Sequence, residues 1–305
     1  MERRAPLRLW VGVFSLAAVV TGCTRERWPS PPSVDPSAYE KEHAAWLAGE
    51  QAYLSEILPV IGIWPLDEGA NSFGSDRSLP IVLPATQVPA LAGTFHRVGN
   101  SVTVVPAADF ALRTTDGATL DAERPLTSIL AGPLRLDVTD AGDDRRWVAA
   151  TDTTHPAVTA PPPVPSYPVD DRWRVMARFD AFKPPKRMRV PDVRGGSMEF
   201  NAVGQLVFRL GGEQRRLTAI GTKTGRRFAV WFKDRTNGST TYGGYRVVKP
   251  QAVDDGGWTI LDFNFASNPP CAYSTFTTCP LSPPENRLPV AVEAGLKQLP
   301  SVRGY

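Results

Sequence analysis

The residues that could do chemistry lie in the C-terminal third of this 305-residue chain. Asp234 and Asp262 each follow an apolar run, and a carboxylate placed there could act as a general base. Tyr242, Arg246 and Asn264 follow closely and carry groups that bind ligands through hydrogen bonds. We predict these five residues as candidate ligand-binding residues at the mouth of a β-rich pocket.

No pattern in the sequence indicates another type of catalysis. There is no G-x-S-x-G motif and no glycine-rich loop that cradles phosphate. His43, His96 and His155 are scattered without the spacing of metal ligands. We therefore predict no metal and no cofactor, and the catalytic residues, if there are any, stay unknown. A hydrolase that uses Asp234 or Asp262 as general base remains an alternative to a binding protein.

Asp234 belongs to the stretch "FKDRTNGSTTYGGYR". Asn237-Gly238 between two β runs is a strong hairpin signature, because a type I′ turn needs positive φ at both central residues. This turn would place Asp234 opposite Thr241. The carboxylate then either lines a pocket or accepts the hydroxyl of Thr241, and the frequency of such cross-strand pairs favours the second role.

Asp262 and Asn264 belong to "WTILDFNF", in which alternate residues face opposite sides of a strand. Leu261 and Phe263 belong to the core set, so Asp262 and Asn264 should face solvent or a cavity. Asparagine side chains also bond to backbone groups in irregular segments. Asn264, Asn268 and Asn286 are therefore as well suited to fixing a loop as to holding a substrate.

The elements that must position these residues begin with one helix. Ser37 and Glu40 have the spacing of a capping box, and Pro59 ends the pattern. Between them, apolar residues recur at steps of three and four and form one stripe that should pack on a sheet. The stripe consists of Tyr39, His43, Trp46, Leu47, Tyr53, Leu54, Ile57 and Leu58.

The rest of the chain is typical of β-structure. Short apolar runs broken by Gly, Pro, Asn and Asp extend from Val60 to Asp152, with the spacing of a sandwich or barrel. A second series alternates cleanly and favours an antiparallel meander. We predict a mainly β fold of two packed antiparallel β units, a sandwich and/or a meander barrel, with an N-terminal amphipathic helix.

The first residues are typical of a secretion signal. Arg3, Arg4 and Arg8 precede an apolar run, 9–20, that is too short to span a bilayer. The end of this run, Val20-Thr21-Gly22-Cys23, resembles the lipobox of bacterial lipoproteins, which implies cleavage before Cys23 and its acylation. The proline-rich segment that follows should act as a spacer between lipid and fold. We thus expect a lipid-anchored protein of the cell envelope that faces away from the cytoplasm, at the outer membrane if the cell has two.

These patterns divide the chain into six parts. They are a signal peptide (1–22), a lipidated Cys23 with its tether (23–37), the helix with a first β unit (38–155), a proline-rich crossing (156–168), a β meander with a stapled loop (169–295) and a tail (296–305). With Cys23 acylated, Cys271 and Cys279 remain as an even pair in an oxidising compartment, so we predict a disulfide between them.

Charge indicates no nucleic-acid partner. The chain carries 34 basic and 31 acidic residues, without the concentrated basic stripe that nucleic acid requires. The predicted partners are the membrane, through Cys23, and a small molecule or a component of the envelope.

The stretches quoted above, together with "GANSFGSDRSLPIVLPA" and the segment from Asp262 to Leu288, resemble the bacterial family called domain of unknown function 1684. The resemblance extends from about Tyr39 to Gly295. It implies no reaction and no catalytic residue. The function we expect is a lipid-anchored, non-catalytic module that binds a small molecule, a glycan or a protein of the envelope.

Overall fold

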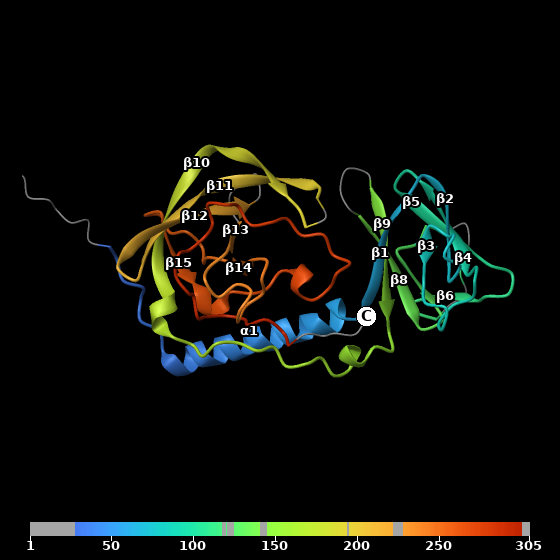
Figure 1. The fold of residues 1–305 in the computed structure, drawn as a ribbon, viewed down its shortest axis with the longest axis horizontal. Coiled ribbons are helices and arrows are strands. Elements are labelled where there is room, and N and C mark those ends of the chain that lie inside the picture. Colours follow the sequence, from blue (N-terminus) through green and yellow to red (C-terminus); the bar gives the residue numbers. More distant parts are fainter. Residues whose placement is uncertain are drawn as a thin grey trace, which may run out of the picture.

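The computed structural model describes residues 28–117, 120, 125–140, 145–193, 195–221 and 228–300. The predicted signal peptide and Cys23 lie outside them. The described chain is mainly β, with antiparallel sheets in two units and one N-terminal α-helix (Figure 1). The predicted fold class is therefore confirmed. No helix within the described ranges is long and apolar enough to cross a membrane.

The helix α1 spans Pro36–Ile57, and its N-cap lies two residues before Ser37 of the predicted capping box. Asp35 is the N-cap, and its side chain accepts a hydrogen bond from the amide of Ala38 at 2.8 Å. Pro36 occupies the first turn, where a missing N–H has no cost. The predicted box of Ser37 and Glu40 is wrong, because Asp35 caps the helix in front of the proline and Ser37 lies within the first turn.

The predicted apolar stripe of α1 is its packing face, with Tyr39, His43, Leu54 and Ile57 buried. This face does not lie on the β unit that follows it in sequence. Figure 1 shows α1 along the underside of the second β unit, with only its C-terminal end near β1. The helix thus joins the two units while packing mainly on the later one.

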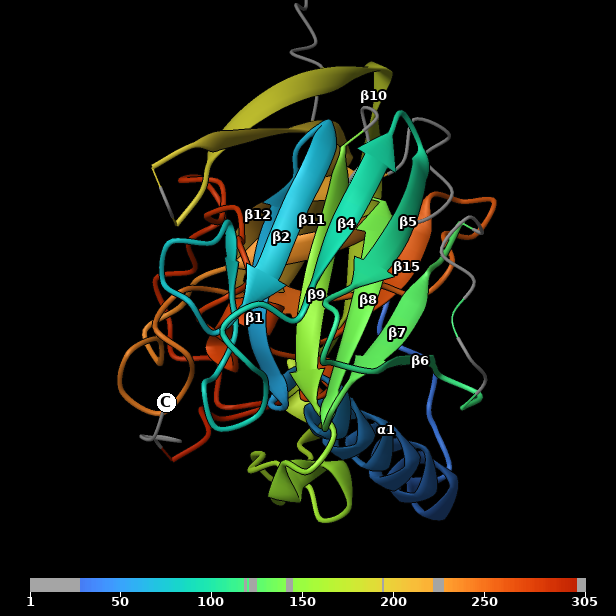
Figure 2. The ribbon, with the colours of Figure 1, turned by 90° about the vertical axis from the view of Figure 1, so that its right-hand side faces the viewer.

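The first β unit contains two sheets that share one core. Their strand orders are β1-β9-β8-β7-β6 and β3-β2-β4-β5, and Figure 2 shows them in front of the second unit. Phe73 and Phe95 stack at 4.8 Å in the core that the two sheets share. The strands are β1 (Val60–Leu66), β2 (Gly69–Gly74), β3 (Ile81–Val82), β4 (Gly93–Val98), β5 (Ser101–Pro106), β6 (Leu112–Thr114), β7 (Ser128–Ala131), β8 (Leu134–Asp140) and β9 (Arg146–Asp152).

The proline-rich crossing is an ordered segment that returns along α1. It starts with the short 3₁₀-helix η1 (Pro156–Val158) and ends before η2 (Asp171–Trp173). Gln51 donates a hydrogen bond to the carbonyl of Pro161 at 3.1 Å, which fixes the crossing to the helix. Figure 1 shows this green segment passing below α1.

The second β unit is one curved antiparallel sheet, a half-barrel, with the strand order β14-β13-β12-β11-β10-β15. Its concave side holds a core that includes Phe208, Phe232 and Phe263. Ala177 of β10 belongs to this core, and the alternate residues Val175 and Phe179 pack against it. The strands are β10 (Arg174–Pro191), β11 (Ser197–Leu210), β12 (Glu213–Gly221), β13 (Phe228–Phe232), β14 (Arg246–Val248) and β15 (Trp258–Asp262).

The predicted two-residue hairpin at Asn237-Gly238 is wrong. β13 pairs with β14 so that Phe232 lies opposite Arg246, and residues 233–245 form a longer loop. The cause is local, because polar side chains bind the backbone before a ladder can form. The amide of Thr236 donates to Asp234 at 2.8 Å, and the amide of Asp234 donates to Asn237 at 2.7 Å.

The segment after β15 closes the half-barrel without regular strands. Strand β15 ends at Asp262, three residues earlier than the alternation predicts, because the Asp262 side chain caps the 3₁₀-helix η3 (Phe263–Phe265). Another such helix is η4 (Pro270–Ala272), and Cys271 is bonded to Cys279 as predicted. Asn286 exchanges two hydrogen bonds with the backbone of Thr218, at 2.7 and 2.8 Å. Disulfide and asparagine side chains thus replace ladder bonds in this segment.

Candidate functional site

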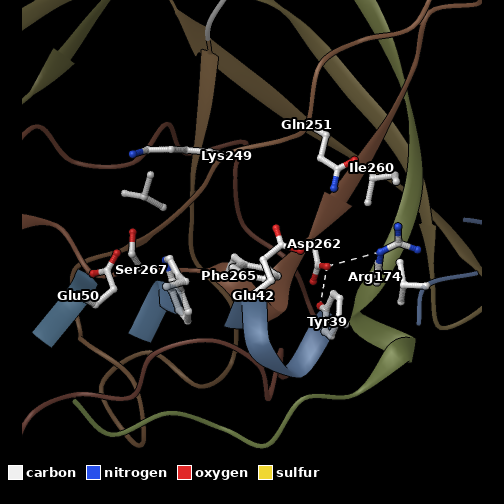
Figure 3. Close-up of a pocket in the computed structure, with 13 residues that line it drawn as sticks. Tyr39, Glu42, Glu50, Arg174, Lys249, Gln251, Ile260, Asp262, Phe265 and Ser267 are labelled. Carbon is white, nitrogen blue, oxygen red and sulfur yellow. Dashed lines mark hydrogen bonds and ion pairs between the residues drawn. The ribbon is translucent and has the colours of Figure 1, made fainter. Parts of the chain in front are cut away.

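A cleft of about 320 Å³ lies between α1 and the half-barrel (Figure 3). One wall is helical and the other comes from β15, η3 and the segment after β14. We call it the α1 cleft, and its lining residues are Val34, Tyr39, Glu42, Trp46, Glu50, Arg174, Val247, Lys249, Gln251, Ile260, Asp262, Phe265 and Ser267.

The helical wall follows from the 3.6-residue period of α1. Tyr39, Glu42, Trp46 and Glu50 are separated by three or four residues, so they share one face. Tyr39 is buried at one end of the row, while Glu42 is exposed at the cleft edge. The row therefore presents an alternation of aromatic and acidic groups to the cleft.

Asp262 forms the polar end of the cleft, and both of its side-chain oxygens accept hydrogen bonds. Tyr39 donates its hydroxyl to Oδ2 at 2.6 Å, and the Nε of Arg174 lies 3.7 Å from the same oxygen. The Oδ1 atom accepts from both the amide and the side-chain nitrogen of Asn264, each at 3.0 Å. Figure 3 shows Tyr39 and Arg174 converging on this carboxylate.

Two neighbours of Asp262 are held in fixed protonation states. Burial, and secondly the hydrogen bond to Asp262, raise the pKa of Tyr39, so the phenol remains a donor. Burial lowers the pKa of His43, so its ring is neutral near pH 7. Its Nε2 lies 3.2 Å from the carbonyl oxygen of Asn264, and it must carry the proton to make that hydrogen bond.

The middle of the cleft combines aromatic surface with charge. Trp46 and Phe265 meet edge to face at 5.3 Å, and both are only partly buried. Burial raises the pKa of Glu50, although the nearby ammonium of Lys249 and the indole of Trp46 act in the opposite direction. Lys249 and Gln251 are exposed on the facing wall. A ligand here would meet an apolar face, two carboxylates, an ammonium and an amide.

Asp234 and Arg246 form a separate, buried ion pair. Their side chains are fully buried, and Nη2 of Arg246 lies 2.6 Å from Oδ2 of Asp234. The same guanidinium donates to the carbonyls of Val292 and Ala294. These contacts tie the 233–245 loop to the last part of the chain. Neither group lines the α1 cleft.

Tyr242 lies in a third place. It lines a shallow depression of about 280 Å³ together with Cys271 and Gln298, and its carbonyl accepts from the side chain of Asn237 at 2.6 Å. The five predicted residues are therefore not brought to one mouth. Asp262 lines the α1 cleft, Asn264 supports it from behind, and Asp234, Arg246 and Tyr242 lie elsewhere.

Sequence reasoning missed the residues that face the α1 cleft from α1 and from the opposite wall. Glu42 and Glu50 share the helix face of Tyr39 and Trp46, and this spacing was available in the sequence. Lys249 and Gln251 follow β14 and carry no comparable pattern. Within the described part of the chain, no group of three or more His, Cys, Asp or Glu residues is placed to hold a metal.

The fold and site define a two-unit β protein with a ligand-sized cleft under an N-terminal helix. Residues 162–297 match the family described as "Protein of unknown function (DUF1684)". The match covers the second β unit. It begins at residue 162, whereas the resemblance seen in the sequence begins at about Tyr39.

One solved structure is similar to part of the chain in sequence. An uncharacterised protein of Haloarcula marismortui, determined by NMR in solution, is 32% identical over 44% of this chain and 75% of its own, with a TM-score of 0.37. No curated protein matches the chain in sequence.

Proposed function

We propose that this protein is a lipid-anchored, non-catalytic binding module of the cell envelope, and that the α1 cleft holds its ligand. The class of ligand that fits best is a sugar unit of an envelope glycan. The lipid anchor is proposed from the lipobox-like residues before Cys23. The ligand is proposed from the composition of the cleft, which is the observation that carries this function.

A sugar ring has an apolar face and a rim of hydroxyl groups. Trp46 and Phe265 offer partly exposed aromatic surface for such a face. Glu42 offers acceptors, while Lys249 offers donors and the Gln251 amide offers both. Pockets of a few hundred cubic ångströms with apolar walls and a few polar groups are typical of small-molecule sites.

Binding has more support than hydrolysis because neither predicted carboxylate is placed for proton transfer. A general base must reach a proton of the substrate and needs an oxygen that is not already occupied. Asp234 is fully buried against Arg246. Asp262 lines the cleft, but Tyr39, Arg174 and Asn264 already occupy both of its oxygens.

The test is native mass spectrometry of the chain from Thr24 onward with soluble oligosaccharides released from the envelope of the source cell. We expect a retained oligosaccharide whose dissociation constant rises about tenfold or more in Glu42→Gln, since a hydrogen bond to a charged group contributes about 1.5–3 kcal/mol.

The matched control is Glu40→Gln, which changes an exposed glutamate of the same helix outside the cleft. Equal effects of the two substitutions, or no adduct with any oligosaccharide, would contradict the proposed site. Shortened oligosaccharides in the spectrum would favour the hydrolase instead.

A further inference from the structure

The first described residues are bound to the fold rather than standing away from it as a free spacer. The indole of Trp28 donates to the carbonyl of Met176 at 3.2 Å and meets the ring of Trp258 edge to face at 5.0 Å. The guanidinium of Arg209 lies 5.5 Å from the centre of the Trp28 ring. Arg174 then donates to the carbonyl of Pro32 at 2.7 Å. The segment from Trp28 to Asp35 is thus docked on the half-barrel.

This docking takes place at one end of the molecule. Figure 1 places the start of the described chain, in blue, at the end of the long axis where β15 and the β11–β12 turn lie. The first β unit, with β1 to β9, lies at the opposite end. We call the surface formed by Trp28, Arg209 and Trp258 the Trp28 end. Trp28 and Trp258 are both only partly buried there.

Chain length limits how far the Trp28 end can lie from a lipid on Cys23. Trp28 follows Cys23 by five residues, which span at most about 18 Å when fully extended. This reach keeps Trp28 within about 18 Å of the acyl chains on Cys23. Tryptophan is also enriched where protein meets the membrane interface, and arginine keeps its charge in water while its stem covers apolar surface.

We infer that the Trp28 end rests on the phospholipid surface and that the long axis stands away from the membrane, with the first β unit outermost. This inference rests on the proposed acylation of Cys23. It assigns the phospholipid headgroup region as the partner of the Trp28 end. It also makes the first β unit the part of the protein that meets components farther from the membrane.

The test uses the lipidated full chain reconstituted in vesicles of phosphatidylethanolamine and phosphatidylglycerol whose acyl chains carry bromine, a quencher of tryptophan fluorescence. We expect bromolipid to quench the wild type, and the double variant Trp28→Phe/Trp258→Phe to lose most of that quenching. The matched control is Trp64→Phe/Trp147→Phe, which changes two partly buried tryptophans of the first β unit and should keep the quenching. Unchanged melting temperatures show that the variants fold.

Each other outcome has a definite meaning. Quenching that is lost only in Trp64→Phe/Trp147→Phe would place the first β unit on the membrane and overturn the orientation. A wild type that sediments with vesicles but shows no quenching would mean that the Trp28 end does not touch lipid, while the anchor stands. If the wild type sediments no better than Cys23→Ala, the anchor itself fails, and the orientation fails with it.

Discussion

Removing the positive charge of the buried pair should destabilise the second β unit strongly. In Arg246→Met the carboxylate of Asp234 loses its partner at 2.6 Å while remaining fully buried. The carbonyls of Val292 and Ala294 lose a donor as well. The amide and hydroxyl of Thr236 still donate to Asp234, but they cannot neutralise its charge. The variant therefore keeps the shape of the core and leaves a charge within it.

The size of the effect follows from the burial of the pair. Breaking a buried ion pair by removing one partner costs about 3–5 kcal/mol, whereas an exposed pair contributes about 0–1 kcal/mol. In a domain of this size, 1 kcal/mol shifts the melting temperature by about 2–4 °C. We therefore expect Arg246→Met to lower the melting temperature by about 6–20 °C. Asp234→Asn/Arg246→Met should recover part of this loss, because it buries no charge.

Denaturant unfolding of the chain from Thr24 onward, followed by circular dichroism and tryptophan fluorescence, measures the free energies of unfolding, and thermal unfolding measures the melting temperatures. Arg178→Met is the matched control, since Arg178 pairs with Asp180 at 3.0 Å but the two side chains are 36% and 41% exposed. A loss below about 1 kcal/mol in Arg246→Met, equal to that of the control, would refute the reasoning. So would a double variant that is less stable than Arg246→Met, because a neutral pair leaves no buried charge to penalise.

Two further predictions concern the stapled segment and the support of the cleft. Replacing Cys271 and Cys279 by serine should lower the free energy of unfolding by about 2.5 kcal/mol, the chain-entropy value for so short a loop. An unchanged denaturation midpoint would contradict this prediction. Reductant should lower the midpoint of the wild type but not that of the variant. The pKa of His43 is lower in the folded state than its value of about 6.5 in the unfolded state. The contribution of neutral His43 to stability is therefore complete above pH of about 6.5, and it is lost as the pH falls from there through the folded pKa. His43→Gln should flatten this part of the pH–stability curve, and a curve as steep as that of the wild type would exclude His43 as the cause.

The parts of the fold that a repeating pattern encodes were predictable. The three- and four-residue steps of α1 predict its packing face, and the alternation in β10 predicts that Val175, Ala177 and Phe179 pack on the core, because side-chain direction follows the period of each element. The 233–245 loop was not predictable from such a pattern. The side chains of Asp234 and Asn237 accept hydrogen bonds from nearby backbone amides, and these bonds override the turn preference of Asn-Gly.

The candidate site was only partly predictable, for a different reason. Asp262 could be identified as a polar residue at the end of a strand. Its partner Tyr39 lies 223 residues earlier, and no local pattern indicates which sheet a helical stripe will cover. Glu42 and Glu50 become candidate ligand-binding residues only once that sheet is known.

The separation between α1 and the strand it covers sets an order of assembly. A chain made from its N-terminus has the apolar stripe of α1 before β15 exists, and the whole first β unit lies between them. The entropic cost of closing so long a loop grows only slowly with length, so final stability suffers little, but distant contacts slow folding. Until β15 is made, the stripe is exposed apolar surface of the kind that chaperones bind. We therefore expect a newly made chain to complete the first β unit early and to bury the apolar face of α1 last.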